Sequence, residues 1–465
     1  MSLRTDDTCE TAKVVLKSRP FHWTADEGYR LYSPEQTFSR LEPFVNSITG
    51  ITSDPVPVEE TADVHVYQVS HNSPFGPHDR HKDRSWKRDI ATGKGQTDIQ
   101  AKVSCLAEAI ERYSCVYRGD ELRIKARLSD LGESGVHPNV LSNFSPLQYA
   151  NREEWNQYNP GSSWVPEPFD ETEEIEWTPN WSLTQQKVRW LPTAYCYFEY
   201  EYGDGRAFCH GDSNGCASGN CLEEAVLQGF FELVERDSMA LFWYTRARRP
   251  AVVLESFNDA FFDSMCKHYR SKNRTLAVLD ITTDLGIPAM VAVSWTEDGR
   301  RILVGMGAHL DPRIAVSRAI GELNQMASAE SWNRDVNEGG LSNPQDHRYM
   351  SDWMANATIR NQPYLVPDET CSRDSGQLRR PPQSNDLLQE IGRCAEIVHK
   401  HDMELILLDL TRNDVNFPTV RVTVPGLRHF WPRFGPGRLF DVPLKLGWID
   451  KHLDERELNP IPFFF

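Results

Sequence analysis

The hydrophobic and polar positions along the chain alternate between helical and extended patterns. Apolar residues recur with helical spacing over 96–118, 221–246 and 312–331, which predicts three long helices. Another helix is expected near 386–401. Runs rich in β-branched residues predict strands at 64–71, 275–282, 289–295, 301–307, 404–411 and 419–426. This mixture predicts an α+β fold in which helices pack on mixed sheets.

The stretches outside these elements divide the chain coarsely. We interpret 128–190, which is rich in Trp and Pro, as loop and edge structure, and its acidic run DETEEIEW (170–177) as solvated surface. Residues 1–92 carry little recognisable chemistry, and we expect them to belong to the same globule without assigning them a role. The predicted functional domain is 93–465, which ends in a proline-containing tail.

Charge and cysteine usage exclude several classes of partner. Among 465 residues, 67 acidic and 50 basic side chains leave a formal charge of −17, which would repel nucleic acid. Ten cysteines without a C-x-x-C pair resemble neither a disulfide framework nor a zinc ribbon, which favours the reducing cytoplasm. No stretch approaches the roughly 18 apolar residues of a membrane span. We therefore expect neither nucleic acid nor membrane as a partner.

One internal repeat concerns the predicted strands. The segments 280–288 and 409–418 both contain Asp, an apolar residue and Thr, then a second Asp and Pro, and each precedes a predicted strand. This repeat predicts two related α/β lobes. The alternative is a chance recurrence of strand, turn and strand.

The three long helices share a second, sharper template. In each helix an alanine precedes a glutamate by seven residues and a second polar residue by ten. The three sets are Ala101 with Glu108 and Glu111, Ala225 with Glu232 and Glu235, and Ala315 with Glu322 and Gln325. Side chains three apart lie on one helix face, so each pair is expected to point at one site.

These polar pairs predict a site for a divalent cation and phosphate. Apolar neighbours imply that the helices are buried, and converging buried glutamates are costly unless a cation compensates them. Mg²⁺ is commonly bound by few carboxylates together with substrate phosphates. Arg112, Arg236 and Arg318 add donors for phosphate, and Lys94 lies in a Gly-rich turn, TGKGQT (92–97). The alternative is a solvated helix face with intrahelical ion pairs.

The residues that carry this chemistry resemble the YcaO family. The resemblance rests on GKGQTDIQAKVSCLAEAIERYS (93–114), SNGCASGNCLEEAVLQGFFELVERD (213–237), DPRIAVSRAIGELNQ (311–325) and DLTRNDVNFPTVRVTVPGL (409–427). It implies a YcaO-like fold around a buried site for ATP and Mg²⁺. The implied metal ligands are Glu108, Glu111, Glu232, Glu235 and Glu322. Together with Lys94, the nucleotide-binding residues are then Ser104, Arg112, Asn220, Glu224, Arg236, Arg318 and Gln325.

The activity implied by the resemblance is that of an ATP-dependent, azoline-forming peptide cyclodehydratase. Such an enzyme phosphorylates a backbone amide oxygen of a ribosomal precursor peptide and converts Cys, Ser or Thr into thiazoline or oxazoline. Azoline-forming members tend to end in a tail resembling P-x-P-x-P, and here Pro460 and Pro462 keep the alternation. We therefore expect Pro460, Pro462 and the terminal carboxylate of Phe465 to serve catalysis. The alternative is an apolar terminus packed in the core.

The resemblance also implies partners. No segment of the chain is recognisable as a leader-binding domain, so we expect a separate E1-like protein that grips the precursor peptide. An FMN-dependent dehydrogenase in the same complex and a homodimer within the synthetase are further expectations. Two alternatives stay open: a YcaO enzyme that makes thioamides or amidines, and a non-catalytic nucleotide-binding scaffold subunit. The complete set of glutamates favours catalysis over the scaffold.

Overall fold

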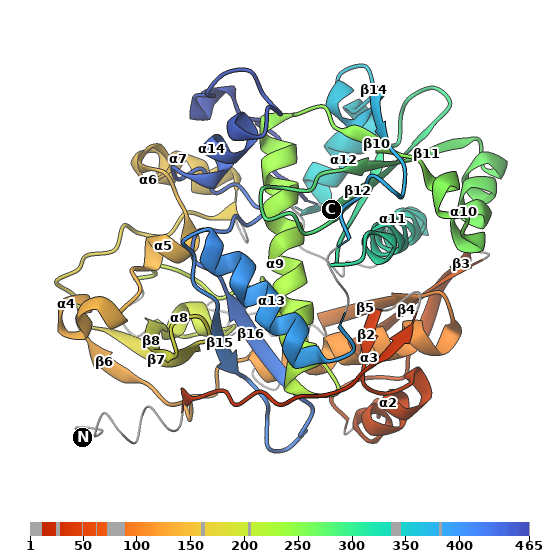
Figure 1. Ribbon diagram of the computed structural model, residues 1–465. Helices are drawn as coiled ribbons and strands as arrows, with labels where there is room; N and C mark the ends of the chain where they lie inside the picture. The colour runs from red at the N-terminus through yellow and green to blue at the C-terminus, as the bar shows by residue number, and fades with distance from the viewer. Residues whose placement is uncertain are drawn as a thin grey trace.

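A computed structural model of the chain describes residues 12–24, 28–48, 50–61, 63–71, 89–159, 163–202, 206–335, 346–380 and 384–464. Figure 1 shows a mixed arrangement of helices and sheets, which confirms the predicted fold class. Within these ranges no helix combines the length and apolar character that a membrane crossing requires. The tail residue Phe465 lies outside the described residues.

The strands of the described residues form three larger sheets and one short hairpin. The first sheet has the order β3 (Val56–Thr61), β4 (Val64–His71), β5 (Asp89–Gly95). The second has the order β13 (Leu303–Ala308), β12 (Ala289–Thr296), β11 (Arg274–Asp280), β10 (Pro250–Val252), β14 (Asp368–Arg373). The third has the order β6 (Ile124–Ala126), β7 (Ile175–Ser182), β15 (Ile406–Asp409), β16 (Thr419–Thr423), β9 (Cys216–Ser218), with β8 (Lys187–Pro192) paired to β7. The hairpin joins β1 (His22–Thr24) and β2 (Gly28–Arg30).

The predicted helices are all present. The three long ones are α3 (Asp98–Cys115), α9 (Leu222–Thr245) and α11 (Pro312–Asp335), and the fourth is α13 (Leu387–Lys400). Further helices are α2 (Pro34–Leu41), α10 (Ala260–Ser271), α12 (Asp346–Asn356) and α14 (Arg438–Lys445). Short ones are α4 (Leu128–Leu131), α5 (Pro138–Ser142), α6 (Pro146–Ala150), α7 (Arg152–Tyr158) and α8 (Thr193–Cys196).

The segment 128–190 is more regular than its composition indicated, because β7 is an interior strand and not edge structure. Pro179 lies in the middle of β7, where proline usually rules out an interior strand. β8 pairs along one edge of β7, while β6 pairs at 175–177 and β15 at 181–182 on the other edge. Pro179 falls between these two stretches, so its missing N–H costs no ladder hydrogen bond.

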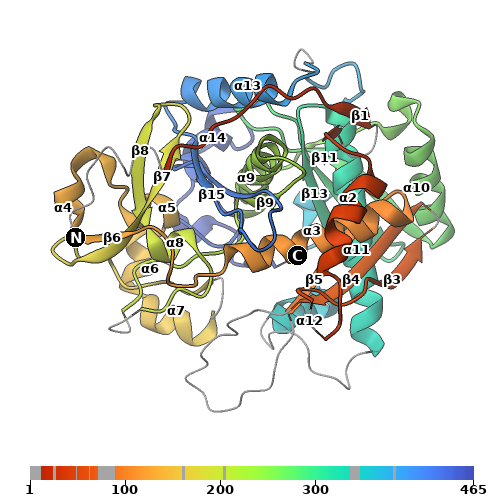
Figure 2. The ribbon, with the colours of Figure 1, turned by 90° about the horizontal axis from the view of Figure 1, so that it is seen from below.

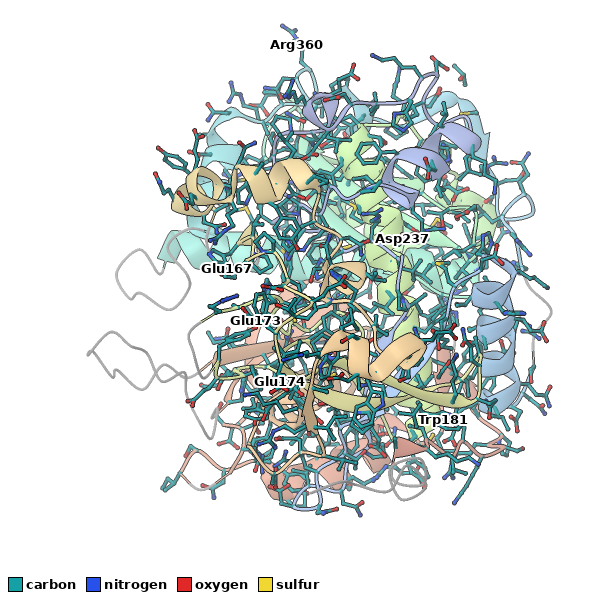
Figure 3. The ribbon with its side chains drawn as sticks, turned by 90° about the vertical axis from the view of Figure 1, so that its left-hand side faces the viewer. Glu167, Glu173, Glu174, Trp181, Asp237 and Arg360 are labelled. Atoms are coloured by element: carbon teal, nitrogen blue, oxygen red, sulfur yellow. The ribbon has the colours of Figure 1, made fainter. Side chains whose placement is uncertain are left out.

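The acidic run beside β7 is partly paired with arginine. Figure 3 labels Glu167, Glu173 and Glu174 in this part of the molecule. Arg206 forms ion pairs with Glu173 of the run and with Glu167, which precedes the run (3.6 Å), while Glu174 is exposed. Exposed and half-exposed ion pairs of this kind contribute little to stability, which agrees with the predicted surface role.

The repeat in the strands has a structural counterpart. β11 pairs with β12 and β15 pairs with β16, both antiparallel, in two different sheets. In the first turn, Asp280 Oδ1 accepts from the amide of Thr282 (2.9 Å), and Thr282 Oγ1 accepts from the amide that opens β12 (3.2 Å). Asp409 and Thr411 repeat both bonds before β16, at 2.9 and 3.1 Å. The prediction of two related lobes is confirmed.

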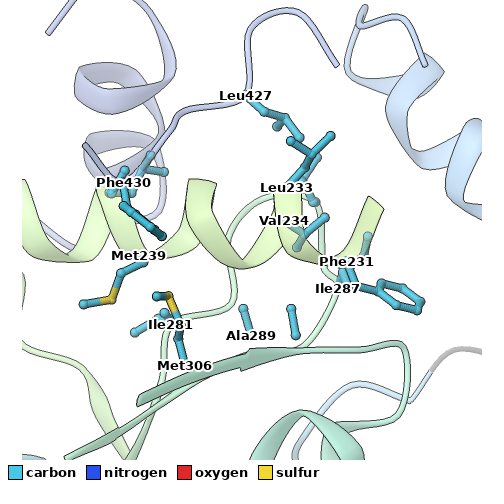
Figure 4. Packing of buried hydrophobic residues seen from close by; sticks show 14 of the residues in the cluster. Phe231, Leu233, Val234, Met239, Ile281, Ile287, Ala289, Met306, Leu427 and Phe430 are labelled. Atoms are coloured by element: carbon cyan, nitrogen blue, oxygen red, sulfur yellow. The ribbon is translucent and has the colours of Figure 1, made fainter. Parts of the chain in front are cut away.

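Helix α9 lies between the two lobes. Figure 2 shows it between the sheet that contains β13 and the sheet that contains β15 and β9. Its apolar residues are buried on all sides, as expected for a helix enclosed by other elements. Figure 4 shows part of this packing, in which Met239 of α9 lies near Phe430 and Ile281. Burial on both sides fixes the orientation of the glutamates that α9 carries.

Two of the long helices, α3 and α11, cross the strand before them at a glycine, and α9 makes a close contact through a glycine of its own. A Cβ at Gly93 of β5 would lie 2.6 Å from the carbonyl oxygen of Ala101 in α3. A Cβ at Gly307 of β13 would lie 2.6 Å from the amide nitrogen of Ala319 in α11. In α9 the glycine is on the helix, where a Cβ at Gly229 would lie 2.6 Å from the carbonyl oxygen of Gly215, just before β9. The shared template of α3 and α11 is therefore part of two similar close strand–helix crossings.

The N-terminal region is continuous with the rest of the fold. The boundary drawn between residues 92 and 93 falls inside β5, which pairs with β4 along its whole length. Helix α2 packs against α3, and both β3 and β4 contact α11. Residues before 93 thus contribute directly to the elements that carry the glutamates.

Candidate functional site

A cleft of about 500 Å³ opens where α3, α9 and α11 meet. The candidate cofactor and metal residues all line it: Lys94, Ser104, Glu108, Glu111, Arg112, Asn220, Glu224, Glu232, Glu235, Arg236, Arg318, Glu322 and Gln325. They come from three helices, from β5 and, for Asn220, from the connection between β9 and α9, which are far apart in sequence. The convergence of the helix template on one place is therefore an observed property of the fold.

Backbone amides hold three of the glutamates in place. The hydrogen bonds run from the amides of Gly215 to Glu232 Oε1 (3.3 Å), Ala308 to Glu235 Oε2 (3.1 Å) and Met306 to Glu322 Oε2 (2.8 Å). Two of these amides belong to β13, so the same strand positions one carboxylate from α9 and one from α11. The carboxylates of the two helices are therefore brought to a common edge of β13.

Arginines lie among these carboxylates. Arg112 pairs with Glu108 (3.2 Å) and Arg236 with Glu232 (3.0 Å), each one turn apart on its helix. These are the intrahelical ion pairs of the alternative interpretation, but they lie in the cleft, with the Arg236 side chain only 15% exposed. Because these ion pairs are partly buried in the cleft, they do not form a solvated helix face.

Arg318 ties the helices of the cleft together. It donates to Gln228 Oε1 on α9 (2.8 Å) and to the carbonyl of Ala308 on β13 (3.3 Å). Elsewhere along α11, Gln325 donates to Thr92 Oγ1 of β5, and Gln96 donates to Ser317 Oγ (3.0 Å). Lys94 lies in β5 itself and not in the predicted Gly-rich turn, and these two bonds fix the end of β5 against α11.

Several glutamates of the cleft are harder to ionise than exposed glutamates. Burial raises the pKa of Glu111 and of Glu232, and burial followed by the charge of Glu322 raises that of Glu235. Burial opposes the charge of Arg112, yet Glu108 and Glu111 hold its pKa above the usual arginine range. Carboxylates that resist ionisation in this way are stabilised by a bound cation.

The residues present fit a cation that is shared with phosphate oxygens. Within the described ranges, no three Asp, Glu, His or Cys side chains are placed to hold a metal ion by themselves. All candidate ligands are carboxylate oxygens, which suit a hard cation, and Mg²⁺ typically takes one or two carboxylates plus waters and phosphate oxygens. The arginines and Lys94 on the same walls supply donors for that phosphate.

The N-terminal region builds another part of the cleft, which the sequence did not indicate. Thr37 donates to Asn220 Oδ1 (3.2 Å), and Arg40 donates to the same oxygen (3.0 Å). Arg30 Nη1 lies 3.6 Å from Glu224 Oε1. Asn220 and Glu224, at the start of α9, are thus held by side chains of β2 and α2.

The only local signal for this contribution was the start of α2. Ser33 and Gln36 form a capping box, in which each side chain accepts from the other's backbone amide. Such a motif announces a helix but carries no information on its tertiary position. Tyr32, Pro34 and Thr37 line the cleft beside Phe417, which lies almost at the other end of the chain.

The proline-containing tail does not line the cleft. Pro460 and Pro462 line a separate cavity of about 250 Å³, and Phe465 lies outside the described residues. The tail runs along α9, where Trp243 Nε1 donates to the carbonyl of Ile461 (2.7 Å). Phe463 is buried at 2% exposure. Pro462 and Phe463 are packed in the core, as the alternative interpretation of the tail predicted.

The fold and the cleft define the class of protein. A family model described as the YcaO cyclodehydratase, ATP- and Mg²⁺-binding, matches residues 92–428. The chain belongs to the YcaO family. An uncharacterized protein of Methanothermobacter thermautotrophicus is 27% identical over 358 residues, which are 73% of this chain and 82% of that protein.

Solved structures give the same assignment. A heterocyclase in complex with substrate and cofactor superposes with a TM-score of 0.88 at 42% identity, and covers 97% of this chain. The heterocyclase TruD superposes with a TM-score of 0.77 at 37% identity, and covers 99%. This chain spans 59% and 57% of those two chains, so each is considerably longer. A YcaO from Methanopyrus kandleri bound with AMPPCP and Mg²⁺ shares the fold, with a TM-score of 0.62 at 21% identity over 89% of this chain.

Proposed function

We propose that this chain is an ATP-dependent cyclodehydratase that phosphorylates a peptide backbone amide and forms azolines from Cys, Ser or Thr. The observation that carries the proposal is the convergence of five glutamates and three arginines from three template helices on one cleft. The similarity to two heterocyclases over nearly the whole chain supports the same reaction class.

The proposed reaction has three steps. The side-chain S–H or O–H of the substrate adds to the carbonyl carbon of the preceding amide, loses its proton and leaves an oxyanion. That oxygen takes the γ-phosphoryl group of ATP, and ADP departs. Loss of the amide N–H proton then expels inorganic phosphate and leaves the C=N bond of the azoline. One ATP becomes ADP and phosphate for each ring.

The residues of the cleft are proposed to position and neutralise charge. Glu108, Glu111, Glu232, Glu235 and Glu322 would hold Mg²⁺, which when bound neutralises charge on the transferred phosphoryl group. Lys94, Arg112, Arg236 and Arg318 would donate to the phosphate oxygens. Asn220, Glu224, Ser104 and Gln325 would orient the nucleotide. Because the backbone amides of β13 fix the carboxylates, this site is largely organised before the substrate binds.

The tail is proposed to act mainly by support. Pro462 and Phe463 are buried beside α9, so they would hold the C-terminal half of that helix in place. The Phe465 carboxylate is retained as the proposed proton acceptor on the strength of the family resemblance alone.

Partners complete the proposed enzyme. A separate E1-like protein would hold the leader of the precursor peptide, and an FMN-dependent dehydrogenase would oxidise azolines to azoles. A synthetase complex of known structure, the E. coli microcin synthetase McbBCD, has the same fold in the part that matches this chain, at 13% identity. The isolated chain should therefore hydrolyse ATP slowly and modify peptide poorly.

Isotope transfer tests the proposed chemistry. A substrate peptide carrying ¹⁸O in the amide carbonyl before the reacting Cys, Ser or Thr should deliver that oxygen to inorganic phosphate, with loss of one water from the peptide. Phosphate without the label would contradict amide phosphorylation. A gain in mass from exchange of oxygen for sulfur would instead identify thioamide formation. An amidine loses the same water as an azoline, so fragmentation of the product must show whether an internal amine or the Cys, Ser or Thr side chain closed the ring. ATP binding without any turnover would favour the scaffold alternative.

A further inference from the structure

A basic groove lies apart from the acidic cleft. Its volume is about 530 Å³, it shares no lining residue with the cleft, and it is formed by β10, β14, the turn between β11 and β12 and the end of α14. Four arginines line it: Arg248, Arg249, Arg373 and Arg379. The acidic residues that line it are Asp280 and Asp368. The groove therefore carries a surplus of positive charge in a chain whose formal charge is −17.

Arg249 is fixed on the floor of this groove. Its guanidinium carbon lies 4.0 Å from the ring centroid of Trp448, and its Nε donates to the carbonyl of Asp280 (3.1 Å). Burial lowers the pKa of Arg249 to about 10, although the charge of Asp280 works in the opposite direction. The cation has thus lost more hydration than its protein neighbours replace, and an anion would stabilise it.

The other arginines are arranged around this fixed cation. Arg373 Nε lies 3.5 Å from Asp280 Oδ2, with 46% of its side chain exposed. The guanidinium of Arg379 packs across Gly286, where a Cβ would leave it no room. Arg248 and Arg379 are exposed, and within the described ranges neither side chain forms a hydrogen bond or a close ion pair, although Arg248 interacts electrostatically with Asp368. Two cations are therefore held in position and two are open to a ligand.

We propose that this groove binds an acidic segment of another polypeptide through several carboxylates. Arginines from three separate segments of the chain offer more donors than one compact anion would use, and planar guanidinium groups suit carboxylates. Repulsion by the acidic remainder of the surface is screened beyond about 8 Å at physiological ionic strength, so the local charge decides. The site is independent of the proposed function, because the groove and the cleft have no residue in common.

Binding of defined peptides tests this proposal. Fluorescence anisotropy with fluorescein-labelled oligoglutamate should show binding that weakens as salt is added. Oligoglutamine of the same length should not bind. Equal binding of the two peptides, or binding of neither, would overturn the proposal. Displacement of oligoglutamate by inorganic phosphate at an equal concentration of negative charge would also overturn it, because the groove would then be a small-anion site.

Charge reversal locates the binding. The variant carrying Arg248→Glu and Arg379→Glu should lose at least tenfold in affinity for oligoglutamate and keep wild-type ATP hydrolysis. Both side chains are exposed, so the substitutions leave the core unchanged. The matched control carries Arg270→Glu and Arg360→Glu, which change the net charge equally at exposed positions outside the groove; Arg360 is labelled in Figure 3. An equal loss in the control would show general electrostatics and would refute a defined site.

Discussion

The guanidinium carbon of Arg236 lies 4.3 Å from the centroid of the Phe430 ring. The same arginine pairs with Glu232 in the acidic cleft (3.0 Å), while the Phe430 ring packs against Phe463 of the tail with centroids 4.9 Å apart. The tail is thus connected to the cleft through two side-chain contacts, although its prolines lie elsewhere. Because of this connection, we expect a change in the tail to alter nucleotide binding in the cleft as well as stability.

Replacement of Glu232 by Gln tests the acidic cleft. The change removes one charge with little change of volume, so the fold should persist while ATP turnover falls on the order of 10²-fold or more, because charge neutralisation of this kind contributes several kcal/mol. Glu396→Gln, an exposed position on α13, is the matched control. Turnover at the wild-type rate in the Glu232 variant would remove this residue from the site.

Replacement of Phe463 by Ala tests the connection from the tail. Loss of a buried phenylalanine should lower the free energy of unfolding by about 3–5 kcal/mol. Because Phe430 then loses its neighbour, Mg·ATP affinity should fall as well. Pro460→Ala, at an exposed tail position, should change neither quantity. Thermal unfolding and nucleotide titration of both variants measure these two quantities. Unchanged ATP affinity in a destabilised Phe463 variant would show that the contact through Phe430 does not affect the cleft.

Replacement of Gly307 by Ala tests the strand–helix crossing. The added Cβ would lie 2.6 Å from the amide nitrogen of Ala319, so β13 and α11 must separate, at an expected cost of about 1–3 kcal/mol. The separation should weaken the hydrogen bond from Met306 to Glu322 and with it Mg·ATP affinity. Gly392→Ala on α13, where a Cβ meets open space, is the control. Wild-type unfolding and affinity in the Gly307 variant would refute a close crossing.

The pH dependence of stability tests the charge balance of the cleft. Burial, then Glu322, raises the pKa of Glu235 to about 8. Between the ordinary glutamate value and that pH, the folded protein holds a proton that the unfolded chain has released, so stability falls as pH rises. Without nucleotide and Mg²⁺, the unfolding temperature should drop on the order of a few °C between about pH 6 and pH 8.

Two additions check the origin of this slope. Mg·ATP should raise the unfolding temperature most at the higher pH, because a cation favours the ionised carboxylates. Glu235→Gln should flatten the decline measured without ligand. A stability that rises over the same pH range, or an unchanged slope in the variant, would contradict the raised pKa.

Local spacing was enough to predict the elements that carry the site. The periodicity of apolar residues gave α3, α9 and α11, since each buries apolar side chains against a neighbouring sheet. The repeated distance from alanine to glutamate predicted one destination for three helices. The crossing of α3 with Gly93 of β5 and that of α11 with Gly307 of β13 are similar, which agrees with this prediction. A repeat of spacing is visible in sequence because helix geometry turns spacing into direction.

Other features depended on contacts between distant segments. Thr37 and Arg40 reach Asn220 from α2, which packs beside α3, and Arg30 reaches Glu224 from β2. No local pattern specifies that packing, since capping and periodicity define a helix but not its neighbours. The prediction of edge structure for β7 was wrong for the same reason. Pro179 fits an interior strand because it lies between the residues that pair with β6 and those that pair with β15, and only the tertiary structure shows this.

The sequence by itself determined the long helices, the related strand pairs, the family and the polar residues of the cleft, because these follow from periodicity, spacing and motif. The tertiary structure alone decided that β13 amides hold Glu235 and Glu322, that Phe463 reaches Arg236 through Phe430, and that arginines from 248–249, 373 and 379 share a groove. Such contacts join residues separated by long stretches of chain. They form only when burial of apolar surface has fixed how helices and sheets pack, and that information is distributed over the whole sequence.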